Sequence, residues 1–157
     1  YFEQAAALAQ NPVALCNLIL GEAFAQIALR DSEHTGERGP EALPVAPEHM
    51  AALSDMIGTG KVNSSTGKKI LAALFDHDQD PEAYARTHDL FTLTDSAALE
   101  AAAREAVEKN PDMVRSYRAG KTSVEKALMG KAMALTRGKA DPEALRQKLL
   151  ELLGKQE

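Results

Sequence analysis

Four of the seven prolines in this 157-residue chain directly follow Asn or Asp, and this pairing constrains the fold more than any other feature. An Asn or Asp at a helix N-cap accepts a hydrogen bond from a free backbone N–H, and Pro suits the first helical position because it needs no donor there. An acidic residue follows three of the four pairs, where it faces the positive end of the helix dipole. The predicted helix starts are Asn11-Pro12, Asp80-Pro81, Asn110-Pro111 and Asp141-Pro142.

The composition also favours an all-α fold. Ala, Leu, Glu and Lys dominate, aromatic residues make up 4% of the chain, and Trp is absent. Ala and straight-chain residues lose little on entering a helix, whereas strands are usually built from β-branched and aromatic residues. We therefore expect a multihelical fold of about eight short helices in two packed subdomains. The expected helices are 12–30, 48–58, 65–76, 81–88, 95–109, 111–119, 122–136 and 142–153. Glycines stand where a left-handed C′ residue would end a helix; these are Gly58 or Gly60, Gly120, Gly138 and Gly154.

Two stretches between the helices organise the chain. Residues 31–47 combine prolines, glycines and charges and predict a loop. Residues 90–93 alternate apolar and polar side chains as a strand does, but they lack a plausible partner, so we expect an extended connector that packs its two leucines inward. A break near residues 77–94 gives two expected subdomains, 1–78 and 79–157.

Charge is distributed unevenly along the chain. The formal net charge is −5, which by itself argues against nucleic acid. Residues 1–110, however, hold 8 Lys and Arg against 17 Asp and Glu, whereas residues 111–157 hold 10 against 6. Local potential, rather than total charge, steers a polyanion. The C-terminal region is therefore a candidate for contact with RNA.

The single cysteine, Cys16, excludes an intrachain disulfide and indicates no oxidising compartment. The longest apolar run, residues 13–20, is too short to span a bilayer, and no basic region precedes it as in a signal peptide. We therefore expect a cytoplasmic protein without a membrane partner. The chain opens at Tyr1, not at Met, and with a helical pattern, so we expect a piece of a longer polypeptide.

Three apparent motifs fail the chemistry that they resemble. Residues 60–69 imitate a phosphate loop, but six residues separate the glycines instead of four, and Lys69 stands where a magnesium-binding hydroxyl is required. Residues 76–80 imitate a calcium loop, but Pro81 and Thr87 occupy the places of its Gly and Glu. We interpret the first as a capped turn and the second as a helix end. The histidines lack zinc-site spacing and no catalytic constellation is visible, so we predict no catalytic and no metal site.

Basic residues gather between Arg115 and Lys139, where seven cations accompany one acid, Glu125. Two of them flank Gly138 in a tight turn, where long side chains can reach phosphates. The same pattern also fits the solvated face of an ordinary helical domain. The candidate RNA-binding residues are Arg115, Arg118, Lys121, Lys126, Lys131, Arg137, Gly138 and Lys139. Two further cations, Arg146 and Lys148, lie beyond them.

The same region resembles the C-terminal signature of the GatB/YqeY family, which reads approximately N-P-x-x-V-x-x-Y-x-x-G-K, then L-x-G-Q-V-M, then T-x-G-x-A-x-P. The matching residues are Asn110-Pro111, Val114, Tyr117, Gly120-Lys121, Leu128, Gly130, Met133, Thr136, Gly138, Ala140 and Pro142. Weaker similarity covers most of the chain, including Tyr1-Phe2-Glu3, residues 16–20 and residues 57–63. Lys131 replaces the usual Gln, Asp141 the usual Asn, and Leu18 the common Trp. Lys131 puts in doubt any role that required a Gln amide there.

The resemblance implies the C-terminal tail of the B subunit of an aspartyl/glutamyl-tRNA amidotransferase. Such a complex converts Glu-tRNA(Gln) or Asp-tRNA(Asn) to the amidated form with ATP, magnesium and glutamine. Its A subunit hydrolyses glutamine, and the catalytic part of the B subunit activates the tRNA. The resemblance therefore implies a non-catalytic fragment without a cofactor of its own, with tRNA as ligand and the A and C subunits as partners through the rest of the B subunit.

Two alternatives remain open on the sequence alone. A free-standing YqeY-like protein would share the signature but should begin with Met. A protein–protein interaction module would use the acidic N-terminal half as its binding surface, and its C-terminal cations would not contact tRNA.

Overall fold

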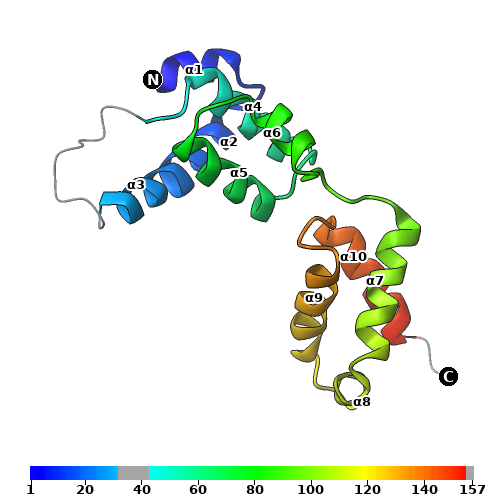
Figure 1. The fold of residues 1–157 in the computed structure, drawn as a ribbon. Helices are drawn as coiled ribbons and strands as arrows, with labels where there is room; N and C mark the ends of the chain where they lie inside the picture. Colours follow the sequence, from blue (N-terminus) through cyan, green and yellow to red (C-terminus); the bar gives the residue numbers. More distant parts are fainter. Residues whose placement is uncertain (32–42, 155–157) are drawn as a thin grey trace. The chain divides into compact units, whose positions relative to one another are not determined.

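The structure, a computed structural model, describes residues 1–31 and 43–154 and is all-α, as predicted. Most of the expected loop at residues 31–47 lies outside the described residues. The described part contains nine helices when the continuous run over residues 12–31 is counted once, close to the expected number. The chain divides into two compact units, unit 1 at Tyr1–Phe91 and unit 2 at Thr92–Glu157 (Figure 1).

The boundary between the units falls inside the stretch 77–94, where a break was expected, but after residue 91 instead of after residue 78. Packing explains the difference. Helix α6 (Pro81–Thr87) contacts α4 (Pro47–Gly58) and α5 (Ser64–Asp76), and its Ala85 is fully buried in the core of unit 1. An apolar side chain in that core ties its helix to the first unit.

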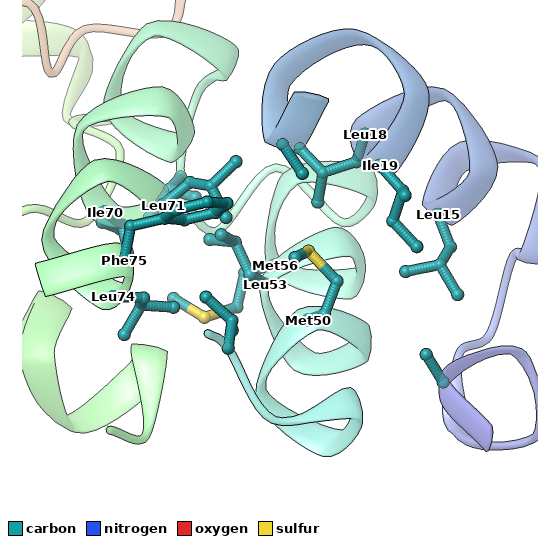
Figure 2. Close-up of a cluster of buried hydrophobic side chains, with 14 of the residues drawn as sticks. Leu15, Leu18, Ile19, Met50, Leu53, Met56, Ile70, Leu71, Leu74 and Phe75 are labelled. Carbon is teal, nitrogen blue, oxygen red and sulfur yellow. The ribbon is translucent and has the colours of Figure 1, made fainter. Parts of the chain in front are cut away.

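Unit 1 is built around α4, which contacts α1, α2, α5 and α6. Its remaining elements are α1 (Phe2–Leu8), α2 (Pro12–Asn17), the π-helical segment η1 (Leu18–Ala23) and α3 (Phe24–Asp31). Figure 2 shows how side chains from α2 and η1 and side chains from α5 meet α4. Leu15, Met50, Leu53 and Ile70 are fully buried there. Because these residues come from three separate segments, burying them fixes the arrangement of the helices.

One long helical run of the described residues, from α2 to α3, is rich in apolar side chains. Residues 12–30 are long and apolar enough to cross a membrane by length and composition alone, and 22% of the most apolar window is buried. One side of the run buries Leu18 and Ala23 in the core of unit 1. Its charged residues are paired: Glu22 Oε1 lies 2.7 Å from Lys68 Nζ, and Arg30 bonds Asp76. The run therefore packs Leu18 and Ala23 into the core of unit 1, while Val13 and Leu20 stay exposed.

Unit 2 contains α7 (Ser96–Glu108), α8 (Pro111–Arg118), α9 (Val124–Leu135) and α10 (Pro142–Gly154). Its core joins α7, α9 and α10 through Leu99, Leu128, Leu145 and Leu149, all of which are at most 2% exposed. The leucines of α10 are four residues apart, so they lie on one face of the helix, as the sequence pattern predicts. This core holds α9 so that its opposite face is exposed.

The predicted helix starts are confirmed, with one difference in capping. Asn11 accepts from the N–H groups of Val13 and Ala14, and Asp80 caps α6 in the same way. At the start of α8 the Asn110 side chain makes no cap bond; its Nδ2 donates instead to the Ala106 carbonyl at 2.7 Å. Asn110 is thus used to close the end of the preceding helix, α7.

The capped-turn interpretation of residues 60–69 and the helix-end interpretation of residues 76–80 are both confirmed. Gly60 has a φ of 76° and ends α4, and the Asn63 side chain accepts from the Thr66 N–H at 2.8 Å to start α5. Helix α5 ends at Asp76, and the Asp80 carboxylate caps α6. Helix capping by the Asn63 and Asp80 side chains therefore accounts for both sequences.

Candidate RNA-facing surface

The turn between α9 and α10 has an unusual backbone conformation. Arg137 has a φ of 56° and Gly138 a φ of 74°. The Arg137 N–H donates to the Ala134 carbonyl at 3.0 Å, and the Gly138 N–H donates to the Met133 carbonyl at 2.9 Å. These two bonds are those of a Schellman motif with Arg137 at C′. We expected Gly138 at C′, but it is the residue after, so a non-glycine residue occupies the left-handed position.

The other end of this turn is held by the segment that precedes α7. The Leu93 N–H donates to the Lys139 carbonyl at 2.7 Å, and the Asp141 N–H donates to the Leu93 carbonyl at 3.1 Å. These bonds form an isolated parallel bridge between Leu93 and Ala140. The expectation that residues 90–93 lack a partner was therefore wrong for Leu93. The bridge fixes the backbone that carries Arg137 and Lys139.

The exposed face of α9 lies between two lysines. Ala127, Gly130 and Ala134 are exposed and recur at helical spacing, so they form one face with small side chains. Lys126 and Lys131 are exposed on the two flanks of this face. Small residues between cations allow the phosphate backbone of a nucleic acid to approach closely while the lysines reach its charges.

Three more of the predicted cations lie at the end of α8 and in the turn before α9. Arg115 and Arg118 end α8, and Lys121 follows in the turn; all three are exposed. Arg115 is ion-paired with Asp112 one turn earlier, which offsets its charge. Arg118 Nε lies 3.5 Å from the Leu153 carbonyl oxygen, at the end of α10. Of these three, Lys121 therefore contributes its charge to the surface most directly.

Four of the predicted cations form a strip that runs from the turn before α9 to the turn after it. Between Lys126 and Arg137 the helix rises by roughly 16 Å, because each helical residue adds about 1.5 Å. Lys121, Lys126, Lys131 and Arg137 are exposed and form no ion pair with any residue within 1–31 or 43–154. Three of these cations, Lys126, Lys131 and Arg137, lie along this length, and Lys121 lies in the turn before α9.

One cation of this region, Arg146 on α10, was not among the candidate residues. Its Nε donates to Glu125 Oε1 on α9 at 2.6 Å, and this bond raises the pKa of the guanidinium above its ordinary value. Arg146 also lines a hollow of about 670 Å³ beside Lys126. Lys148 points elsewhere, toward Glu151 at 3.9 Å. The contact with Glu125 joins residues 21 apart, so no short-range pattern could reveal it.

A second hollow lies in unit 1 and differs in charge. It measures about 240 Å³ and is lined by residues of α2, η1, α4 and α5, including Asn17, Ser54 and Ile57. The Glu22–Lys68 ion pair contributes both signs to its wall, so it has no electrostatic preference for an anion. Among the described residues no group of three or more His, Cys, Asp or Glu is placed to hold a metal ion. The strip on unit 2 is therefore the candidate site for a polyanion.

Comparison with known proteins identifies the family. The family model described as the GatB domain matches residues 1–153. The chain belongs to the GatB domain family. It is 31% identical over 98% of its length to the B subunit of the aspartyl/glutamyl-tRNA(Asn/Gln) amidotransferase of Nitratidesulfovibrio vulgaris. The protein of the same name from Corynebacterium efficiens is 38% identical over 78% of the chain.

This GatB domain corresponds to the C-terminal portion of those proteins. The chain spans 31% of the N. vulgaris protein and 25% of the C. efficiens protein. A similar match, 30% identical over 97% of the chain, is found in Agathobacter rectalis. The family resemblance noted in the sequence is thus confirmed over nearly the whole chain, and not only over the signature between Asn110 and Pro142.

Proposed function

We propose that this GatB domain is the non-catalytic tRNA-binding tail of the B subunit in an aminoacyl-tRNA amidotransferase and positions misacylated tRNA for transamidation. The observation that carries the proposal is the strip of exposed cations along α9, from Lys121 to Arg137, none of which is neutralised by an acid of the described chain. In A-form RNA the base edges of the major groove are hard to reach, whereas phosphates and shape are accessible. The strip suits contacts of that kind.

The left-handed Arg137 supports the same proposal. A non-glycine residue in this conformation costs about 1–2 kcal/mol, and such costs concentrate at functional sites. Glycine would remove the strain, and the chain uses Gly120 with a φ of 102° at the end of α8. The chain also places a non-glycine residue, Asp89 with a φ of 52°, after α6. The proposal therefore rests on the exposed charge of Arg137, and its conformation is consistent with a side chain that is needed for binding.

In this proposal ATP, magnesium and glutamine are used by the rest of the complex, in the cytoplasm, and the domain itself holds none of them. The A and C subunits meet the B subunit through its remaining part. Unit 1 also exposes large apolar side chains on α2 and η1, with Val13 69% and Leu20 58% exposed. Single exposed apolar side chains are common on protein surfaces and by themselves indicate no partner. The proposal therefore assigns contact with tRNA to unit 2 alone.

The test is steady-state kinetics of the complete complex with Lys131 and Arg137 both replaced by Ala. Two exposed charge contacts together are worth roughly 1.4 kcal/mol, so the KM for misacylated tRNA should rise about tenfold. Glutamine hydrolysis should be unchanged. Arg104→Ala is the matched control, because Arg104 is an exposed cation of the same unit that is paired with Glu100 on α7. An unchanged KM in the double variant would refute the proposed surface.

A further inference from the structure

The hollow beside the start of α9 combines groups of different chemistry in one place. It has a volume of about 670 Å³ and opens between the α8–α9 turn, the first turns of α9, and α10. All of its lining residues belong to unit 2; they are Thr122, Ser123, Glu125, Lys126, Met129 and Arg146. The volume is within the range of small-ligand sites in proteins, about 300–1,000 Å³.

Arg146 is oriented in this hollow by Glu125. Glu125 lies on α9 and its side chain is 20% exposed, whereas Arg146 on α10 is 49% exposed. The bond between them uses the Nε of Arg146, at 2.6 Å. An arginine has five N–H donors, and the four on the two terminal nitrogens have no partner among the residues that the structure describes. The carboxylate therefore fixes the guanidinium of Arg146 through Nε and leaves its two terminal nitrogens for a ligand.

The terminal nitrogens of Arg146 and the neighbouring side chains suit a ligand that contains a phosphate. The two terminal nitrogens of an arginine match two oxygens of a phosphate in a bidentate contact. Lys126 adds a second cation at the same hollow, and with Glu125 the local charge is positive by one. The hydroxyls of Thr122 and Ser123 can bond ribose hydroxyl groups, and half-buried Met129 offers an apolar surface to a sugar or base.

We infer that the hollow receives one nucleotide of the bound RNA, with its phosphate between Arg146 and Lys126 and its ribose beside Thr122 and Ser123. This inference rests on the proposed function and extends it, because it assigns a defined nucleotide site at one end of the strip. Glu125 acts as a positioning residue: it does not touch the RNA but holds the arginine toward the phosphate.

The experiment measures tRNA affinity of the complete complex against salt concentration for Arg146→Ala, Arg146→Lys and Glu125→Gln. Arg146→Ala should weaken binding about three- to tenfold and reduce the salt dependence by about one released counterion. Arg146→Lys should keep the salt dependence of the parent. It should regain only part of the affinity that Arg146→Ala loses, because an ammonium group cannot make the two parallel hydrogen bonds of a guanidinium. Glu125→Gln should bind at least as tightly as the parent, since the amide oxygen still accepts from Nε and the repelling charge is gone.

The matched control is Lys148→Ala on the same helix, which removes an equal charge outside the hollow and should leave affinity within about twofold of the parent. If Arg137→Ala weakens binding but Arg146→Ala does not, the nucleotide site is refuted and the proposed function survives. If neither weakens binding, the proposed function itself fails. If Glu125→Gln binds tRNA more weakly and also melts at a lower temperature, the Glu125–Arg146 contact serves only to stabilise unit 2, and the inference is overturned.

A further experiment distinguishes binding of an RNA strand from binding of a free nucleotide, since both carry a phosphate and a ribose. Adenosine monophosphate at millimolar concentration should leave tRNA binding unchanged, because one nucleotide lacks the contacts along α9. Displacement of tRNA from the parent complex by this probe alone would overturn the assignment to a strand.

Discussion

Replacement of Arg137 by glycine should stabilise unit 2 and weaken its binding to tRNA. Arg137 is the C′ residue of α9, with a φ of 56°. Relief of the left-handed conformation is worth about 1–2 kcal/mol. Glycine also enlarges the freedom of the unfolded chain, which costs about 0.4–1 kcal/mol. The net gain in the free energy of unfolding lies between about 0 and 1.6 kcal/mol, with a central value of about 0.8 kcal/mol.

Scanning calorimetry on the chain can detect this gain. For a domain of this size, 1 kcal/mol shifts the melting temperature by about 4–8 °C, so the central value of the gain should raise the transition of unit 2 by about 3–6 °C. In the complete complex the same variant loses one cation, so its tRNA affinity should fall and the salt dependence should decrease by about one counterion. Stability and binding thus change in opposite directions.

Arg137→Ala is the matched control, because alanine keeps the backbone strain but loses the charge. It should melt close to the parent protein and bind tRNA as weakly as the glycine variant. A glycine variant that melts below the parent, or an alanine variant that gains as much stability, would refute the argument from strain. A glycine variant with parental affinity for tRNA would refute the role of the side chain.

Two further substitutions test the same reasoning at other glycines. Gly120→Ala places a side chain at a φ of 102° in the turn before α9, and it should lower the free energy of unfolding by about 1 kcal/mol in a chemical denaturation experiment. Gly130→Ala adds a methyl group into open space on the exposed face of α9, so it should raise helix stability by about 0.8–1 kcal/mol. Its tRNA affinity, measured by filter binding, should nevertheless fall, because the methyl group holds the phosphate backbone away from Lys126 and Lys131; equal or tighter binding would contradict close approach at this face.

Much of the fold could be predicted because capping is local. An Asn or Asp before Pro offers a side-chain acceptor and needs no donor at a helix start, and every such pair begins a helix in the structure, although the Asn110 side chain makes no cap bond. Gly60 and Gly120 were likewise predictable as C′ residues, since a positive φ is cheap only for glycine. These signals need only a few neighbouring residues, so they can be found without knowledge of tertiary contacts.

The parts that could not be predicted depend on residues distant in sequence. Leu93 pairs with the backbone around Ala140, and Glu125 meets Arg146 only because α9 and α10 pack together. The π-helical segment η1 also has no local signature in the sequence. The C′ residue of α9 was also predicted one position too late: the sequence pointed to Gly138, and the structure has Arg137 there. For the candidate site, sequence identified the cations but not which of them are already paired.

The backbone of the α9–α10 turn limits how this surface can recognise RNA. A turn with exposed N–H groups could bind a phosphate through its main chain. Here the N–H groups of Arg137, Gly138 and Lys139 all donate to carbonyls of α9 or its cap, and that of Asp141 donates to Leu93. The turn therefore offers an RNA strand its side chains and not its backbone donors. Lysine and arginine side chains contacting phosphates respond to charge and to the spacing of the strand, not to base identity. If the strip along α9 binds RNA as proposed, it should hold the strand by charge and spacing, and discrimination between one tRNA and another would then arise from other contacts.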